Sequence, residues 1–162
     1  MKIRIAGISP ESVVDGPGIR YVVFAQGCKH GCKGCHNPET HSFKGGYEVD
    51  ADEIIKDIKS LKYFDGVTFS GGDPFFQAEG FSYISEKLQK DGIHVMAYTG
   101  FIYENILKDV KMTKLLKSID VLVDGPFIID KKVFNLPFRG SSNQRVIDIK
   151  SSISNGDTIV LG

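Results

Sequence analysis

Short apolar runs that each end in a glycine-containing turn constrain the fold of this chain more than any other feature of its sequence. Their β-branched and aromatic residues are typical of buried strands. We expect these strands at 19–25, 66–70, 93–98 and 119–123. Apolar residues at helical spacing lie between them and predict helices over 51–62, 77–90 and 102–118. Strands that alternate with helices form βαβ units, in which the strands run parallel. The order of elements therefore predicts an α/β fold with a mostly parallel sheet.

Weaker signals occur at the two ends of the chain and inside the last helix. Residues 3–5 predict a short strand, and residues 144–149 and 157–161 predict two further strands. The helix over 102–118 is expected to break near Met112. The sequence has 162 residues, of which 41% are hydrophobic, which suits one domain with a sizeable core. We therefore expect a single domain over 1–162.

The turns that follow the predicted strands carry polar residues and glycines. Functional groups in parallel α/β sheets gather at the carboxyl ends of the strands, which meet at one edge. A segment with three cysteines follows the first long strand. The later turns are Gly71-Gly72-Asp73, Tyr98-Thr99-Gly100 and Asp124-Gly125. We expect all four segments to lie together and to form one site.

The cysteine segment contains every cysteine of the protein, at Cys28, Cys32 and Cys35. An odd and tightly clustered set cannot form a disulfide framework. Three thiolates on one loop can bind three irons of a cubane cluster and leave the fourth iron open to a substrate, whereas closed electron-transfer clusters generally use four cysteines. Gly27, Gly31 and Gly34 would let the loop adopt positive φ and come close to a ligand. The spacing therefore predicts a [4Fe–4S] site with three protein ligands.

Two other interpretations of the cysteines stay open. The first is a structural zinc site, with His36, His30 or His41 as the fourth ligand. Ligands at positions 35 and 36 would be adjacent, which is awkward for chelation. The second is three ordinary thiols, although ordinary free cysteines are usually buried among apolar neighbours. Here the neighbours are Gly, Lys, His and Asn.

Charge and hydropathy exclude some classes of partner. Lys plus Arg number 20 and Asp plus Glu number 20, so no overall field indicates binding to nucleic acid or to an acidic membrane. The first residues lack the apolar region of a signal peptide, and no apolar run approaches the roughly 20 residues that span a bilayer. We therefore expect a cytoplasmic protein without a membrane or nucleic-acid partner.

The Cys-x3-Cys-x2-Cys loop after a strand resembles the hallmark of the radical S-adenosylmethionine superfamily. The segments 15–20 (Asp-Gly-Pro-Gly-Ile-Arg) and 35–39 (Cys-His-Asn-Pro-Glu) resemble those of glycyl-radical-enzyme activases. The segment 139–144 (Arg-Gly-Ser-Ser-Asn-Gln) is similar to the branch that activates anaerobic ribonucleoside-triphosphate reductase. The resemblance extends from about residue 5 to residue 149.

This resemblance implies a fold, an activity and partners. The fold would be a partial (β/α) barrel of the radical S-adenosylmethionine type, shorter than the six-unit form. A [4Fe–4S] cluster would cleave S-adenosyl-L-methionine after one-electron reduction, and the resulting 5′-deoxyadenosyl radical would make a glycyl radical on the large reductase subunit. The implied electron donor is flavodoxin or another low-potential carrier. The activase of a formate-lyase-type enzyme is the alternative, which the 139–144 segment argues against.

The resemblance also assigns cofactor-binding residues. Ser70, Gly71, Gly72 and Asp73 match a glycine-rich motif whose backbone pairs with the methionine ammonium group, and a Cβ there would block the approach. Asp73 replaces the glutamate that is common in the family. Taken alone, this segment is an ordinary βα turn.

The remaining expected contacts involve the adenine and ribose. Many superfamily members have an aromatic residue before the third cysteine, but this chain has Gly34, so His36 and the backbone around Gly34 and Cys35 would take over that packing. Asp124 would bind the ribose hydroxyls or a cation, and Tyr98 would line the ribose or adenine pocket. The plainer interpretations are a β-turn carboxylate for Asp124 and packing at a strand end for Tyr98.

Overall fold

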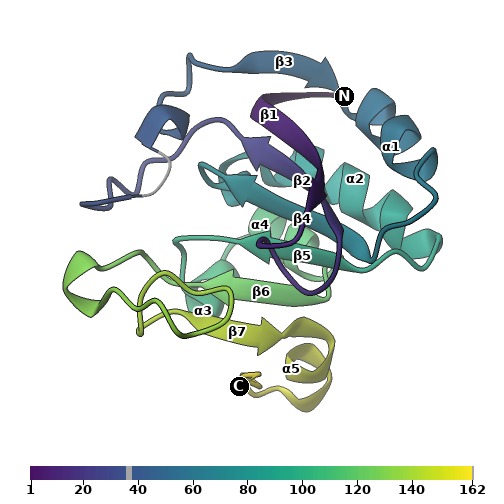
Figure 1. The fold of residues 1–162 in the computed structure, drawn as a ribbon. Coiled ribbons are helices and arrows are strands. Elements are labelled where there is room, and N and C mark those ends of the chain that lie inside the picture. The colour runs from purple at the N-terminus through teal and green to yellow at the C-terminus, as the bar shows by residue number, and fades with distance from the viewer. Residues whose placement is uncertain (36–37, 162) are drawn as a thin grey trace.

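The computed structural model of the protein describes residues 1–35 and 38–161. Within these residues, seven strands form one sheet (Figure 1). The strands are β1 (Lys2–Ser12), β2 (Arg20–Ala25), β3 (Tyr47–Asp50), β4 (Gly66–Gly71), β5 (Val95–Tyr98), β6 (Val121–Asp124) and β7 (Arg145–Asp148). The α-helices are α1 (Ala51–Lys59), α2 (Ala78–Lys90), α3 (Tyr103–Ile106), α4 (Val110–Leu116) and α5 (Ile149–Asn155). Short 3-10 helices are η1 (Pro38–Thr40), η2 (Pro74–Gln77) and η3 (Ile129–Lys131).

The centre of the sheet is parallel, as the βαβ pattern predicted. The strand order is β3-β1-β2-β4-β5-β6-β7. Strands β2, β4, β5 and β6 are parallel neighbours, whereas β1, β3 and β7 pair antiparallel at the two sides. The α/β fold is therefore confirmed as a mixed sheet with a parallel centre. The partial barrel stays a prediction.

One face of the sheet carries the main core. Helices α1, α2 and α4 lie together on this face (Figure 1), and their buried residues include Ile54, Phe81 and Leu115. These side chains pack with residues of the central strands such as Phe69 and Leu122. The helices thus anchor the parallel strands and fix the positions of the turns at their carboxyl ends. No helix in the described ranges is long and apolar enough to cross a membrane.

Local structure departs from the predicted elements in the second half of the chain. The helix expected over 102–118 is divided into α3 and α4, and the division lies before Met112, because Asp109 caps α4 by accepting a hydrogen bond from the Met112 N–H. The strand expected over 157–161 is reduced to one bridge between Val160 and Ile147. Strand β3 was not predicted, and it occupies the edge beside β1.

Candidate functional site

A cavity of about 150 Å³ lies at the carboxyl edge of the parallel strands. Its walls come from the segments that follow β2, β4, β5 and β6, together with the segment before β7. The lining residues are Cys28, His30, Cys32, Cys35, His41, Ser70, Gly71, Gly72, Tyr98, Thr99, Gly100, Gly125, Phe127 and Gln144. The structure therefore brings the four predicted segments to one site. Larger cavities of about 440 and 420 Å³ lie elsewhere and contain none of the three cysteines.

The cysteine loop is held at its base by backbone hydrogen bonds. The N–H of Gly27 donates to Thr40 O at 2.7 Å, and the N–H of Cys28 donates to His41 O at 3.1 Å. The predicted positive φ angles are present at Gly27, Gly31 and Gly34, with values of 114°, 62° and 76°. Because other residues rarely adopt these angles, the glycines fix the path of the loop.

The three thiols border the cavity and are partly exposed. The cysteines, all within the described residues, form no disulfide. Burial raises the pKa of Cys28 to about 11, and the nearby Asp73, Cys32 and Cys35 add to this effect. The Cys28 thiol therefore keeps its proton at neutral pH until a metal ion displaces it. No three His, Cys, Asp or Glu side chains in the described ranges converge closely enough to hold a single metal ion.

A Cβ on Gly71 would lie 2.5 Å from the backbone N of Ala25, and one on Gly72 would lie 2.6 Å from Gly27 O. The turn after β4 is thus packed directly against the end of β2. Two hydrogen bonds join them, from Gly72 N to Ala25 O at 2.8 Å and from Asp73 N to Gly27 O at 3.0 Å.

The Asp73 side chain is fully buried and does not line the cavity. Its hydrogen-bond partners are other residues of the protein. Its Oδ1 accepts from the N–H of Phe75, so that Asp73 caps η2. Its Oδ2 accepts from His30 Nε2 at 2.6 Å and from Gly100 N at 3.0 Å, and the Thr99 hydroxyl donates to both oxygens. These contacts connect three of the segments that line the cavity. A direct contact between Asp73 and the cofactor stays a prediction.

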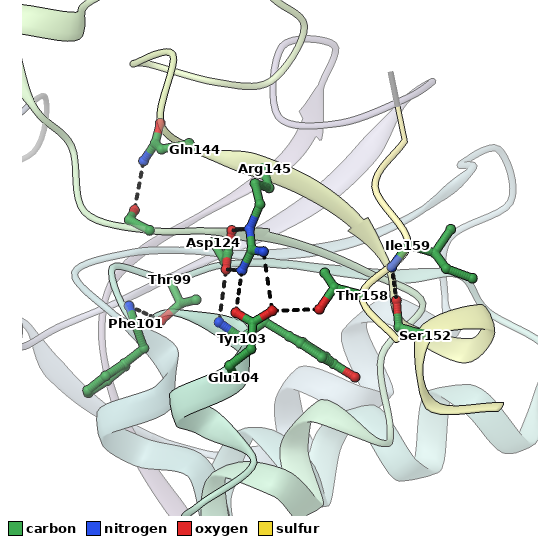
Figure 2. Close-up of polar contacts among 11 residues, drawn as sticks. Thr99, Phe101, Tyr103, Glu104, Asp124, Gln144, Arg145, Ser152, Thr158 and Ile159 are labelled. Atoms are coloured by element: carbon green, nitrogen blue, oxygen red, sulfur yellow. Dashed lines mark hydrogen bonds and ion pairs between the residues drawn. The ribbon is translucent and has the colours of Figure 1, made fainter. Parts of the chain in front are cut away.

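Tyr98 and Asp124 end neighbouring strands but have different surroundings. Tyr98 lines the cavity, and burial, with the charge of Asp15, raises its pKa well above the usual value, so the hydroxyl stays protonated. Asp124 is fully buried and does not line the cavity. Its carboxylate accepts from Arg145 Nε at 3.0 Å and from the Tyr103 N–H at 2.9 Å (Figure 2). With these internal partners, Asp124 fixes the β6–β7 pair.

Of the residues predicted to contact the adenine, only some line the cavity. Cys35 lines the cavity, but Gly34 does not. Gly34 instead lies against the loop after β6, where a Cβ would come within 2.6 Å of Ile129 Cδ1. The predicted contact of His36 lies outside the described residues.

Phe127 is the lining residue that the sequence analysis did not name, and Gln144 was noted there only as part of the 139–144 segment. Thr99, Gly100 and Gly125 lie in turns that were expected at the site, and His30 and His41 were named only as possible zinc ligands. Gln144 anchors the loop before β7, since its amide donates to Gly125 O and its carbonyl accepts from Gly140 N. The signal for Gln144 was the polar segment 139–144. Phe127 has no comparable signal, because a single aromatic residue in a loop is common.

The fold and the site define a class of protein. Three cysteines on one loop line one cavity, beside glycine turns at the edge of a parallel sheet, and this set of donors fits a cluster held by three thiolates. A family model described as a 4Fe–4S single cluster domain matches residues 14–147. The chain therefore belongs to this iron–sulfur family, in the radical S-adenosylmethionine superfamily, and its cofactors are a [4Fe–4S] cluster and S-adenosylmethionine.

Similar curated proteins are activating enzymes. The chain is 37% identical over 144 residues to the anaerobic ribonucleoside-triphosphate reductase-activating protein of Vibrio cholerae, covering 83% of this chain and 91% of that protein. The Haemophilus influenzae protein of the same name is 34% identical, with the same coverage. The pyruvate formate-lyase-activating enzyme of Clostridium pasteurianum is 44% identical over 127 residues, covering 72% of this chain. This chain spans only 53% of the length of that enzyme.

Proposed function

We propose that this chain activates an anaerobic ribonucleoside-triphosphate reductase by generating a glycyl radical on it. The support comes from relatives of that name, which align with the chain over about nine-tenths of their own length. The observation that carries the proposal is the single cavity that combines the three cysteine thiols with the Gly71–Gly72 turn. This arrangement would hold a cluster and a small cofactor side by side.

The residues of the cavity divide into two groups. Cys28, Cys32 and Cys35 would bind three irons, and no further cysteine exists in the sequence to close the fourth. Ser70, Gly71 and Gly72 would hold the amino-acid end of S-adenosylmethionine beside them. When bound and reduced by one electron, the cluster would supply the reductive cleavage of the sulfonium C5′–S bond of this cofactor, and the resulting 5′-deoxyadenosyl radical would take a hydrogen atom from a glycine Cα of the partner.

The rest of the cavity wall orients the cofactor and limits the access of water. Phe127 and Tyr98 provide the large nonpolar surfaces of the wall. The hydrogen bond that Gln144 donates to Gly125 O holds the loop before β7 in place at the cavity. Water exclusion by this wall, once the cofactor is bound, would protect a reactive radical from side reactions.

Reduction needs an electron donor, and we propose flavodoxin or another low-potential carrier of the cytoplasm. Lys29 and Lys33 are exposed on the cysteine loop and give this part of the surface positive charge. Positive charge beside the cluster favours docking of an acidic donor. A reducing compartment also keeps the three thiols available for iron.

The activation of a formate-lyase-type enzyme is the second candidate. It is supported by the 44% identity to the C. pasteurianum enzyme, which exceeds the identity to the V. cholerae and H. influenzae proteins. Both candidates use the same cavity and differ in the partner that presents its glycine.

One experiment distinguishes the two candidates. The protein is reconstituted with iron and sulfide without oxygen, reduced, and mixed with S-adenosylmethionine and either the reductase or a formate lyase of the same cell. Electron paramagnetic resonance should show a glycyl-radical doublet with the reductase, and none with the Cys32→Ser variant. A doublet only with the lyase supports the second candidate. No doublet with either partner, although the cluster is intact, contradicts both.

A further inference from the structure

We propose that His30 is a positioning residue, which holds the cysteine loop against the two turns beside it and thereby sets how S-adenosylmethionine meets the cluster. The inference rests on the cluster and cofactor of the proposed function, and it does not depend on which glycyl radical enzyme is the partner. His30 lies between Cys28 and Cys32 in the sequence, so its position is coupled to that of the thiols.

The hydrogen bond between His30 and Asp73 joins residues that are 43 positions apart. His30 Nε2 lies 2.6 Å from Asp73 Oδ2, and the two side chains are 17% and 0% exposed. The same carboxylate binds the Thr99 hydroxyl and the Gly100 N–H. One buried group therefore connects the cysteine loop, the turn after β4 and the turn after β5. Each of these segments contributes to the cavity wall.

The imidazole ring of His30 is also held by its neighbours. Its centroid lies 4.6 Å from that of Phe101, in an edge arrangement, and 5.3 Å from that of Phe76. A Cβ on Gly100 would come within 2.5 Å of His30 Cδ2, so the ring occupies space that only a glycine leaves open. The ring therefore has little freedom to move while Asp73 and the two aromatic rings stay in place.

The contacts of His30 hold a different part of the cysteine loop from the backbone hydrogen bonds at its base. The backbone bonds of Gly27 and Cys28 to Thr40 and His41 close the base of the loop. His30 is fixed inside the segment that carries the thiols. Without the bond to Asp73, the three thiols would still be available for iron, but the loop could shift relative to the Gly71–Gly72 turn. We therefore expect cofactor binding to suffer more than cluster assembly.

Two substitutions separate the hydrogen bond from the ring packing. His30→Phe retains a ring between Phe76 and Phe101 but removes the donor. His30→Gln retains a donor, because its amide nitrogen reaches a position similar to that of Nε2. Thr99→Val is a second probe, since it removes another donor to the same carboxylate. Each variant is reconstituted without oxygen and checked for iron and sulfide content and for its thermal unfolding midpoint.

The readouts are the affinity for S-adenosylmethionine and the change that it causes in the electron paramagnetic resonance spectrum of the reduced cluster. All variants should contain as much iron as the wild type. His30→Phe should bind the cofactor roughly tenfold to a hundredfold more weakly, the loss expected for a hydrogen bond to a charged group, and should show a diminished spectral change. His30→Gln should recover most of the affinity for S-adenosylmethionine and most of the spectral change. Thr99→Val should lose less affinity than His30→Phe.

The inference is overturned if His30→Phe matches the wild type in affinity and in the spectral change. It is also overturned if His30→Phe and His30→Gln both fail to retain iron, because His30 would then serve cluster assembly. A wild-type protein whose cluster does not respond to S-adenosylmethionine would overturn the cofactor assignment, and the inference with it. Failure to activate a reductase leaves these measurements unchanged and bears only on the partner.

Discussion

Arg145 binds both carboxylate oxygens of Asp124 across the antiparallel β6–β7 pair, with Nε 3.0 Å from Oδ1 and Nη2 2.5 Å from Oδ2 (Figure 2). The Asp124 side chain is only 1% exposed, so the removal of Arg145 would leave a buried charge without its partner. Arg145→Met should therefore lower the free energy of unfolding by about 3 kcal/mol.

Urea denaturation measures this loss. The control is the same Arg145→Met change made in an Asp124→Asn background. The buried group is neutral there, so the loss of Arg145 should lower the free energy of unfolding by less. An equal loss in both backgrounds would show that the ion pair is not the cause.

Glu104 makes stability depend on pH in the acid range. Hydrogen bonds from Arg145, and then from Thr158, lower the pKa of Glu104 to about 2 from its usual 4.5 (Figure 2). A lowered carboxyl pKa contributes stability that is complete above pH 4.5 and is lost as the pH falls towards 2. The effect should be modest, because the Glu104 side chain is 50% exposed.

Glu104→Gln should therefore show a smaller loss of stability over this pH range than the wild type, as measured by chemical denaturation at several pH values. Glu11→Gln is the matched control, at an exposed glutamate for which the structure describes no ion pair. If both variants follow the same pH profile, the Arg145–Glu104 contact has no such role.

His94 should make stability depend on pH nearer neutrality. Burial, with the charge of Arg20 adding to it, lowers the pKa of His94 below its usual 6.5, while Asp120 opposes the shift. Arg20 Nη2 lies 2.9 Å from His94 Nδ1, which accepts its hydrogen bond and must therefore be unprotonated. This contribution to stability is complete above pH 6.5 and is lost as the pH falls below it.

The urea midpoint of the wild type should consequently fall between about pH 7.5 and about pH 5.5, since a histidine titrates in this range. His94→Asn keeps an acceptor for Arg20 close to the position of Nδ1 and should show a smaller fall. A variant that loses as much stability as the wild type would place the pH dependence on another group.

Gly71 tests the close packing of the turn after β4. At φ 96°, a Cβ would lie 2.5 Å from Ala25 N, so that strain and a collision occur together. Gly71→Ala should cost about 3 kcal/mol or more of unfolding free energy. Gly92→Ala provides the control, because Gly92 has φ 73° and a Cβ added there would meet nothing within 4 Å, and it should cost about 1 kcal/mol. Equal costs would mean that the contact with Ala25 relaxes easily.

The cysteines should be needed for the cluster and not for the fold. Cys28→Ser, Cys32→Ser and Cys35→Ser each remove one of three thiol ligands, so none of the variants should assemble an intact [4Fe–4S] cluster. Their far-ultraviolet circular dichroism should match that of the wild type without metal, because the main core lies on the helix-covered face of the sheet. Iron, sulfide and zinc analysis of anaerobically purified protein measures the outcome. A colourless wild type with one zinc would support the zinc site.

The parallel centre of the sheet and its functional edge could be predicted because they depend on local patterns. Apolar β-branched runs mark β2, β4 and β6, and the turns that follow them must share an edge. Strand β3 gives no such signal: it is short, its residues are at least partly exposed, and its pairing with β1 comes from contacts far along the chain. A break in the helix over 102–118 was expected near Met112, but its position before that residue depends on the capping Asp109, which the helical periodicity does not reveal.

At the candidate site too, features with a local sequence pattern could be predicted and features that depend on distant contacts could not. The three cysteines are visible in the sequence because their spacing alone indicates chemistry. The bond between His30 and Asp73 is not visible, because it requires the order of β2, β4 and β5 in the sheet before either residue has a neighbour. Asp124 was expected at the cofactor for its place at a strand end, and only the pairing of β7 reveals Arg145 as its partner.

The walls of the cavity come from segments spread between Cys28 and Gln144. On a chain that is still being synthesised, the three thiols emerge well before the turns after β4 and β5, and the segment before β7 arrives last. Each new molecule therefore passes through a stage with exposed thiols and no cavity. Until the later turns have been made, the thiols rely on a reducing environment to escape oxidation.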